Sequence, residues 1–211
     1  MRDEHIPTGQ VLIVSAASGA GKSSLLRALR ERMPELAVAV SHTTRAPRPG
    51  ESDGVHYHFV DMARFEAMIA ADAFIEHAKV FGNRYGTAQS SVRSLLAEDR
   101  DVIVEIDWQG ARKVREVMPG SVSIYIAPPS RAALEERLRA RGQDSDEVIA
   151  GRMAQARSEL EHWHEYDYLV VNDDFETAVD DLAAIVRSVR LAVDRQAVGQ
   201  QALLTELLQE S

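Results

Sequence analysis

Short continuous apolar runs alternate along the chain with longer stretches in which apolar positions recur every three or four residues. Runs that are apolar at every position suit strands covered on both faces, and the longer stretches suit amphipathic helices. The predicted strands are residues 11–14, 38–40, 102–106, 122–126 and 168–171. The predicted helices are residues 22–32, 109–117, 131–140, 147–162 and 176–193. The alternation predicts an α/β fold built on a doubly wound parallel sheet.

Three segments depart from this alternation. Residues 41–87 are rich in turn residues and alternate at 56–60, which predicts a small antiparallel β-rich insert with one helix at 62–71. Residues 131–164 are rich in Arg, Glu and Asp and predict a helical lid. The predicted core is then 1–40, 88–130 and 165–190. The tail, 191–211, predicts one or two amphipathic helices. Covering the core is the ordinary expectation for them, and contact with a partner or a second copy is the alternative.

Composition narrows the class of protein. The chain has 211 residues, a net charge of −9 and no cysteine. Disulfides, zinc–thiolate sites and thiol catalysis are therefore excluded, and a reducing cytoplasm is the expected location. The acidic balance argues against a nucleic-acid partner, and no apolar stretch approaches the 18 residues or so expected of a membrane span. The first ten residues lack an apolar segment of the signal-peptide type.

The segment after the first strand predicts a phosphate-binding loop. It is close to Gly-x-x-x-x-Gly-Lys-Ser, a pattern that places backbone N–H groups around phosphate oxygens at a helix N-terminus. Lys22 would reach the β- and γ-phosphate oxygens, and the Ser23 hydroxyl would bind Mg²⁺. The predicted ATP-binding residues of the loop are Ala16, Ala17, Ser18, Gly19, Ala20, Gly21, Lys22 and Ser23. The loop alone does not identify the acceptor, because GTPases, ATPases and small-molecule kinases share it.

A second loop carries two arginines three residues apart, Arg45 and Arg48, beside Pro47 and Pro49. Guanidinium groups bind phosphate oxygens bidentately, and the prolines stiffen the loop. In an acidic chain that already has a phosphate loop, this favours a second phosphate site over a solvated basic loop.

The motifs together resemble the guanylate kinase family in its bacterial form. They are SAASGAGKSS, SHTTRAPRPGE, HYHFV, FIEHAKVFGNRYGT, EIDWQGA, PPS, RGQDS and VNDD, and the resemblance runs from about residue 10 to residue 190. It implies transfer of the γ-phosphoryl group of ATP to GMP, giving ADP and GDP, with ATP as donor and Mg²⁺ as cofactor. GTPases are disfavoured, since no Asn-Lys-x-Asp segment follows a strand.

The resemblance also assigns site residues. It places the GMP phosphate against Arg45, Arg48, Tyr57 and Tyr85, and the guanine base against Ser41, Glu76, Thr87 and Asp107. Glu51, in the arginine motif, is assigned to the same GMP site. On the donor side it adds Arg137 and Asn172 near ATP, and it makes catalytic residues of Lys22, Arg45, Arg48, Arg141 and Arg152.

Glu105 is a departure from the family pattern. Relatives commonly carry Asp-Ile-Asp where this chain has Glu105-Ile106-Asp107. The first acid is implied to order Mg²⁺ through water, and Glu keeps the charge with one more methylene. Two alternatives to this activity are disfavoured by the residues present. A kinase for AMP or a pyrimidine nucleotide is disfavoured by Glu76 with Asp107. A catalytically inactive protein-binding module of the guanylate-kinase-like type is disfavoured by the presence of Lys22 and the arginines.

Overall fold

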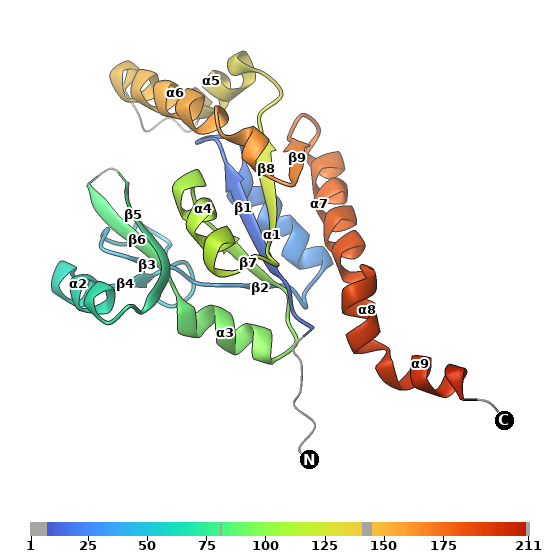
Figure 1. The fold of residues 1–211 in the computed structure, drawn as a ribbon. Helices are drawn as coiled ribbons and strands as arrows, with labels where there is room; N and C mark the ends of the chain where they lie inside the picture. Colours follow the sequence, from blue (N-terminus) through green and yellow to red (C-terminus); the bar gives the residue numbers. More distant parts are fainter. Residues whose placement is uncertain (1–7, 81, 141–144, 210–211) are drawn as a thin grey trace.

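A computed structural model describes residues 8–80, 82–140 and 145–209 of the chain. Within them lie a five-stranded sheet and a separate four-stranded sheet (Figure 1). The strands of the larger sheet, in spatial order, are β2 (Ala37–Val38), β7 (Val102–Glu105), β1 (Val11–Ala16), β8 (Val122–Ala127) and β9 (Tyr168–Val171). Every neighbouring pair is parallel. The predicted doubly wound α/β fold is confirmed.

Helices cover both faces of this sheet. They are α1 (Lys22–Arg32), α3 (Gln89–Ala97), α4 (Trp108–Val117) and α7 (Phe175–Arg190). Side chains of β1 alternate between the faces: Leu12 and Val14 pack with α1 and α7, while Val11 and Ile13 pack with α3 and α4. This two-sided burial explains why the strand is apolar at every position. Helix α3 was absent from the predicted elements; it buries only Val92.

The smaller sheet lies in the predicted insert. Its strands, in spatial order, are β4 (His58–Phe59), β3 (His42–Thr43), β6 (Asn83–Ala88) and β5 (Phe74–Val80). Two pairs are antiparallel, as expected, but β3 and β4 are parallel. The chain between β3 and β4 loops out and re-enters at the same end, so the sheet is mixed. Helix α2 (Met62–Ala70) covers it by stacking Phe65 on Phe74, with ring centroids 4.6 Å apart.

The predicted lid comprises α5 (Arg131–Ala140) and α6 (Asp146–Leu160), followed by the 3₁₀ turn η1 (Trp163–Glu165). Both helices lie over one end of the larger sheet (Figure 1). Leu134 and Leu138 of α5, and Ile149 and Ala156 of α6, are buried in the core on the α1 and α7 side. The boundaries assigned to core, insert, lid and tail remain predictions.

The tail forms α8 (Val193–Gly199) and α9 (Gln201–Leu208), which lead away from the sheet (Figure 1). Neither helix has a buried residue, so the expectation that the tail covers the core is wrong for these two helices. Helix α7, which precedes the tail, buries six residues against the core. Helix α8 contacts the rest of the molecule through an ion pair from Arg195 to Asp101 at 2.8 Å. No described helix is both long and apolar enough to cross a bilayer.

Candidate active site

The phosphate loop connects the end of β1 to the start of α1. Gly19 and Gly21 have φ angles of 90° and 97°, a region that residues with a Cβ rarely adopt. A Cβ on Gly21 would lie 2.5 Å from the Asn172 amide nitrogen, so the site needs glycine for space as well as for conformation. Because β1 is central and parallel, the loop opens at the carboxyl edge of the sheet, where α/β proteins bind ligands.

Two predicted ATP-binding residues hold this loop. Asn172, just after β9, donates from its amide nitrogen to the Ala20 carbonyl at 2.7 Å. Arg137 of α5 donates to the Asn172 carbonyl at 2.9 Å and to the Ala20 carbonyl at 3.4 Å. The structure therefore brings the lid, the end of β9 and the loop together. The contacts of both residues to ATP remain predictions.

Lys22 and Ser23 begin α1, and Glu105 ends β7. The Lys22 ammonium lies 3.8 Å from a Glu105 carboxylate oxygen, with both side chains partly exposed. The Ser23 side chain is exposed at the same helix end. A hydroxyl and a carboxylate are hard oxygen ligands that suit Mg²⁺, which keeps several waters and takes few protein ligands. The residues present therefore fit the metal. No group of three or more acidic or histidine side chains able to hold a metal occurs in the described ranges.

Glu76 on β5 is the most perturbed acid of the insert. Its side chain is only 4% exposed. Burial raises the pKa of its carboxyl to about 7, the Thr87 hydroxyl bond opposes that rise, and the charge of Asp107 adds to it. Thr87 donates to Glu76 at 2.7 Å, and the Ser41 and Thr87 hydroxyl oxygens are 3.1 Å apart. Three predicted base-reading residues thus form one hydrogen-bonded chain across three strands or strand ends.

Helix α4 approaches the Glu76 side chain at Gly110. A Cβ there would lie 2.8 Å from a Glu76 carboxylate oxygen, so a glycine is needed for close approach. Asp107 is the N-cap of α4, where its carboxylate accepts from the Gly110 N–H at 2.8 Å. The fourth predicted base-reading residue therefore also positions the helix that packs on Glu76.

The two arginines of the insert differ in their surroundings. Arg45 is largely buried and donates through one nitrogen to both Glu51 carboxylate oxygens, at 2.8 and 2.9 Å. This bond raises the pKa of the Arg45 guanidinium and lowers the pKa of the Glu51 carboxyl. Glu51 also accepts from the Arg48 backbone N–H at 2.7 Å, while the Arg48 side chain is exposed. Glu51, expected at the GMP site, contacts arginines there.

Tyr57 and Tyr85 lie beside Arg45. Their ring centroids are 5.9 Å apart, and the Arg45 guanidinium lies 5.5 Å from the Tyr57 ring centroid. Burial raises the pKa of the Tyr57 phenol, and the charge of Glu105 raises it further. Three of the four residues assigned to the GMP phosphate, Arg45, Tyr57 and Tyr85, therefore lie close together. The Glu105 carboxylate at the end of β7 is near enough to affect the Tyr57 phenol.

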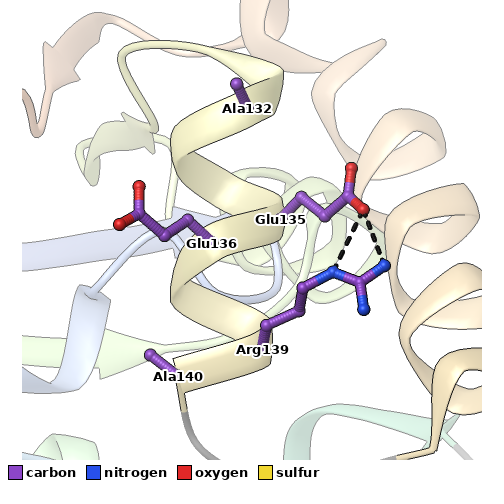
Figure 2. Close-up of a pocket in the computed structure, with 5 residues that line it drawn as sticks. All are labelled: Ala132, Glu135, Glu136, Arg139 and Ala140. Carbon is purple, nitrogen blue, oxygen red and sulfur yellow. Dashed lines mark hydrogen bonds and ion pairs between the residues drawn. The ribbon is translucent and has the colours of Figure 1, made fainter.

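Of the two lid arginines assigned to catalysis, only Arg152 lies within the described residues. Arg152 is half-buried on α6. Arg141 lies outside the described residues. A depression beside α5 is lined by Ala132, Glu135, Glu136, Arg139 and Ala140, and Glu135 pairs with Arg139 one turn further along the helix (Figure 2). It holds none of the predicted site residues and lies on the outer side of the helix.

Sequence reasoning missed two contacts between the lid and the rest of the molecule. Glu159 of α6 accepts from the Ser18 N–H of the phosphate loop at 2.7 Å. His162, the last residue of the predicted helix at 147–162, stacks on Trp108 with ring centroids 3.7 Å apart. It also bonds Glu165 at 2.7 Å, and Arg112 bonds the same carboxylate, which lowers the Glu165 pKa to about 2. No local pattern marks either contact.

The comparisons agree with this geometry. The family model described as guanylate kinase matches residues 8–189. The chain belongs to the guanylate kinase family. Among curated guanylate kinases, that of Methylococcus capsulatus is 58% identical over 200 residues, covering 95% of this chain and 98% of that protein. That of Escherichia coli K12 is 55% identical over 202 residues, again 95% and 98%.

A solved structure supports the same family. The crystal structure of guanylate kinase from Anaplasma phagocytophilum has a TM-score of 0.75 and 33% sequence identity, covering 97% of this chain and 98% of that one. The predicted membership of the guanylate kinase family is therefore confirmed, and with it the prediction of a phosphotransferase. The roles assigned to single residues remain predictions, and nothing in these matches favours an inactive binding module.

Proposed function

We propose that the protein transfers the γ-phosphoryl group of ATP to GMP, giving ADP and GDP. The observation that carries this proposal is the buried Glu76 carboxylate, bonded to Thr87 and facing Gly110 of α4. A buried acid is costly unless a ligand or partner uses it. Glu76 lies on β5 of the smaller sheet, and the two arginines lie in the loop that follows β3 of that sheet, so the insert offers one site for a base and one for a phosphate.

The chemistry of guanine matches Glu76. Guanine presents N1–H and an exocyclic N2–H₂ along one edge, and an ionised carboxylate accepts from both. Adenine presents an N1 lone pair at that edge, which the carboxylate repels. A site whose buried polar groups are left unpaired by the wrong ligand discriminates by about 10⁴-fold. Ser41, Thr87 and Asp107 would complete the contacts to the base.

Arg45 and Arg48, with Tyr57 and Tyr85, would bind the phosphate of GMP. We propose that Glu51 acts through the arginines rather than on GMP, because its oxygens are occupied by Arg45 and the Arg48 backbone. A guanidinium held in place by a carboxylate loses little side-chain freedom on binding a phosphate. Glu51 is therefore proposed as the residue that orients the phosphate clamp.

The donor side would use the phosphate loop, Lys22, Arg137 and Asn172 for ATP. Ser23, and Glu105 through water, would hold Mg²⁺, which when bound neutralises charge on the phosphate oxygens. The acceptor oxygen of GMP is already anionic, so no general base is needed. Lys22, Arg45, Arg48, Arg141 and Arg152 would align the groups and neutralise the charge that moves between them. Insert and lid would close over the core and exclude water.

Coupled measurement of ADP release from Mg-ATP tests the proposal, with GMP, dGMP, AMP, CMP and UMP offered separately. A strong response to GMP, a weaker one to dGMP and almost none to the others is expected. A flat response to every acceptor, with nucleotide still bound, would contradict it. The cytoplasmic location and the contact between copies through the tail, both expected from the sequence, stay predictions.

A further inference from the structure

Glu159 joins the lid to the phosphate loop. It lies in the last turn of α6, and both of its carboxylate oxygens are used. One accepts from the Ser18 N–H at 2.7 Å, and the other accepts from the Gln155 side-chain amide at 2.9 Å. The proposed binding of ATP gives this residue no role.

The backbone that carries Glu159 is fixed by the core. Ala156, one turn earlier, is fully buried, and Met153 and Leu160 pack against the same core cluster. Helix α6 therefore cannot shift at this end without opening that cluster. The position of the carboxylate is set by packing, and the position of Ser18 is set by the carboxylate.

The surroundings of Glu159 disfavour the ionised form of its carboxyl group. Burial raises the pKa of Glu159, the bonds from Ser18 and Gln155 oppose the rise, Asp107 adds to it and Lys22 opposes it. The hydroxyl of Tyr125 is also buried, without a hydrogen-bond partner among the described residues, and the charge of Glu159 helps to raise its pKa. An apolar residue would avoid this cost, so the acid has a use other than packing.

The loop is held on both sides of Gly19. On the near side, Glu159 accepts from the Ser18 N–H; on the far side, Asn172 donates to the Ala20 carbonyl at 2.7 Å. Gly19 lies between the two contacts at a φ of 90°. These contacts take one donor and one acceptor from the loop and fix the direction in which the remaining N–H groups point.

We propose that Glu159 is a positioning residue for the phosphoryl donor: it fixes the Ser18 side of the phosphate loop to α6, the helix that also carries Arg152. The proposal rests on the proposed function, since it assigns ATP to this loop. Loss of the carboxylate should weaken use of ATP and leave GMP unaffected, because Glu76 lies on β5 of the smaller sheet and Arg45 lies in the loop after β3 of that sheet. The alternative is that Glu159 competes with a phosphate for Ser18.

Two variants separate these outcomes. Glu159→Ala removes both hydrogen bonds. Glu159→Gln keeps them without the charge, because its carbonyl accepts from Ser18 and its amide donates to Gln155 once that side chain is flipped. Glu161→Ala is the matched control, since it removes an exposed carboxylate two residues away. Steady-state rates give KM and kcat for ATP and GMP, and calorimetry gives the affinity of each nucleotide.

Glu159→Ala should raise KM for ATP about 10- to 100-fold, the range for a lost hydrogen bond to a charged group. KM for GMP should stay within about twofold, and Glu159→Gln should restore most of the loss. The control should match the parent. An unchanged KM for ATP in a folded Glu159→Ala protein overturns the proposal. A lower KM for ATP in the Glu159→Ala protein also overturns it, in favour of competition with phosphate.

If Glu159→Ala does not fold, Glu159→Asp is measured instead, because it withdraws the carboxylate by one methylene and keeps its charge. It should raise KM for ATP while KM for GMP stays unchanged; equal KM values for ATP in Asp and parent would overturn the proposal. A parent protein without GMP-dependent turnover would contradict the proposed function itself. That result is distinct from normal turnover that ignores Glu159.

Discussion

The two ends of the site are built from different kinds of group. At the proposed donor end the groups that would hold ATP are mainly main-chain atoms of a glycine-containing loop, between a central strand and a helix of the larger core. At the proposed acceptor end the binding groups would be side chains: Glu76 on β5 of the smaller sheet, and Arg45 and Glu51 in the loop between its two-residue strands β3 and β4. Main-chain N–H groups recognise phosphate alone, whereas side chains distinguish one base from another.

This difference predicts different sensitivities. The donor end should respond to changes that disturb the backbone, and the acceptor end to changes in the chemistry of a side chain. Substitutions that affect one end and spare the other would sharpen the comparison. Substitutions that damage both ends equally would break it.

Gly21→Ala should have the largest effect. Alanine at a φ of 97° is strained by about 1–2 kcal/mol, and its Cβ would lie 2.5 Å from the Asn172 amide nitrogen. The resulting shift of the loop should lower kcat/KM for ATP by about 10²-fold or more, while calorimetric affinity for GMP stays unchanged. Gly199→Ala is the control, because a Cβ there meets nothing within 4 Å. Equal loss of GMP binding would show that the two ends are not separable.

Glu76→Gln should have the next largest effect, on the acceptor end only. Preference for GMP over AMP should fall by about 10²-fold, because an amide no longer accepts two hydrogen bonds. In the parent, kcat/KM for GMP should fall as pH drops below about 7, as the Glu76 carboxyl takes up a proton. The Gln variant should lack this limb and retain only the titration of the GMP phosphate, near pH 6 or so.

The titration of Glu76 should also make the free energy of unfolding depend on pH. The pKa of Glu76 is 4.5 in its ordinary range and about 7 when folded, so the folded protein binds the proton more tightly. The free energy of unfolding of the parent should therefore fall as the pH rises from 4.5 to 7, by about 3 kcal/mol for the full pKa shift. Glu76→Gln should gain stability relative to the parent over that interval in denaturant unfolding. A constant difference across pH would mean that Glu76 is not desolvated.

Gly110→Ala should have the smallest effect. The new Cβ would lie 2.8 Å from a Glu76 carboxylate oxygen, so α4 or Glu76 must move. KM for GMP should rise about tenfold with KM for ATP unchanged, and the clash should outweigh the 0.5–1 kcal/mol or so that Ala adds to a helix. Gly151→Ala on α6 is the matched control: nothing lies within 4 Å of its Cβ, and it should stabilise the protein in thermal unfolding. Equal stabilisation of both variants would contradict the close approach.

The sequence predicted the larger sheet well, because its strands are apolar at every position and its helices repeat regularly. Helix α1 begins and ends where expected, at Lys22 and Arg32. Helix α3 was missed because its N-cap, Ala88, makes no side-chain cap and only Val92 is buried. The strand expected at residues 56–60 shortens to β4, since the loop before it turns outward.

Prediction of the site residues was also uneven, because only residues in a local sequence motif can be recognised from the sequence. Residues in a local motif, such as Lys22 and Arg45, could be assigned to the site from their neighbours along the chain, and their roles remain predictions. Glu159 could not be, because its partner is 141 residues away and nothing in the sequence distinguishes it from the exposed acids of the lid. The tail leucines are amphipathic in pattern, yet pattern alone does not say whether another surface is present to cover them.

The central place of β1 has a consequence for synthesis. It leaves the ribosome before every other strand that the structure describes, yet its neighbours in the sheet, β7 and β8, lie far along the chain. Asn172, which holds the Ala20 carbonyl, comes 152 residues after it. Nucleotide therefore cannot stabilise the early nascent chain. A chain interrupted before β9 carries the whole sequence of the phosphate loop without the means to close it.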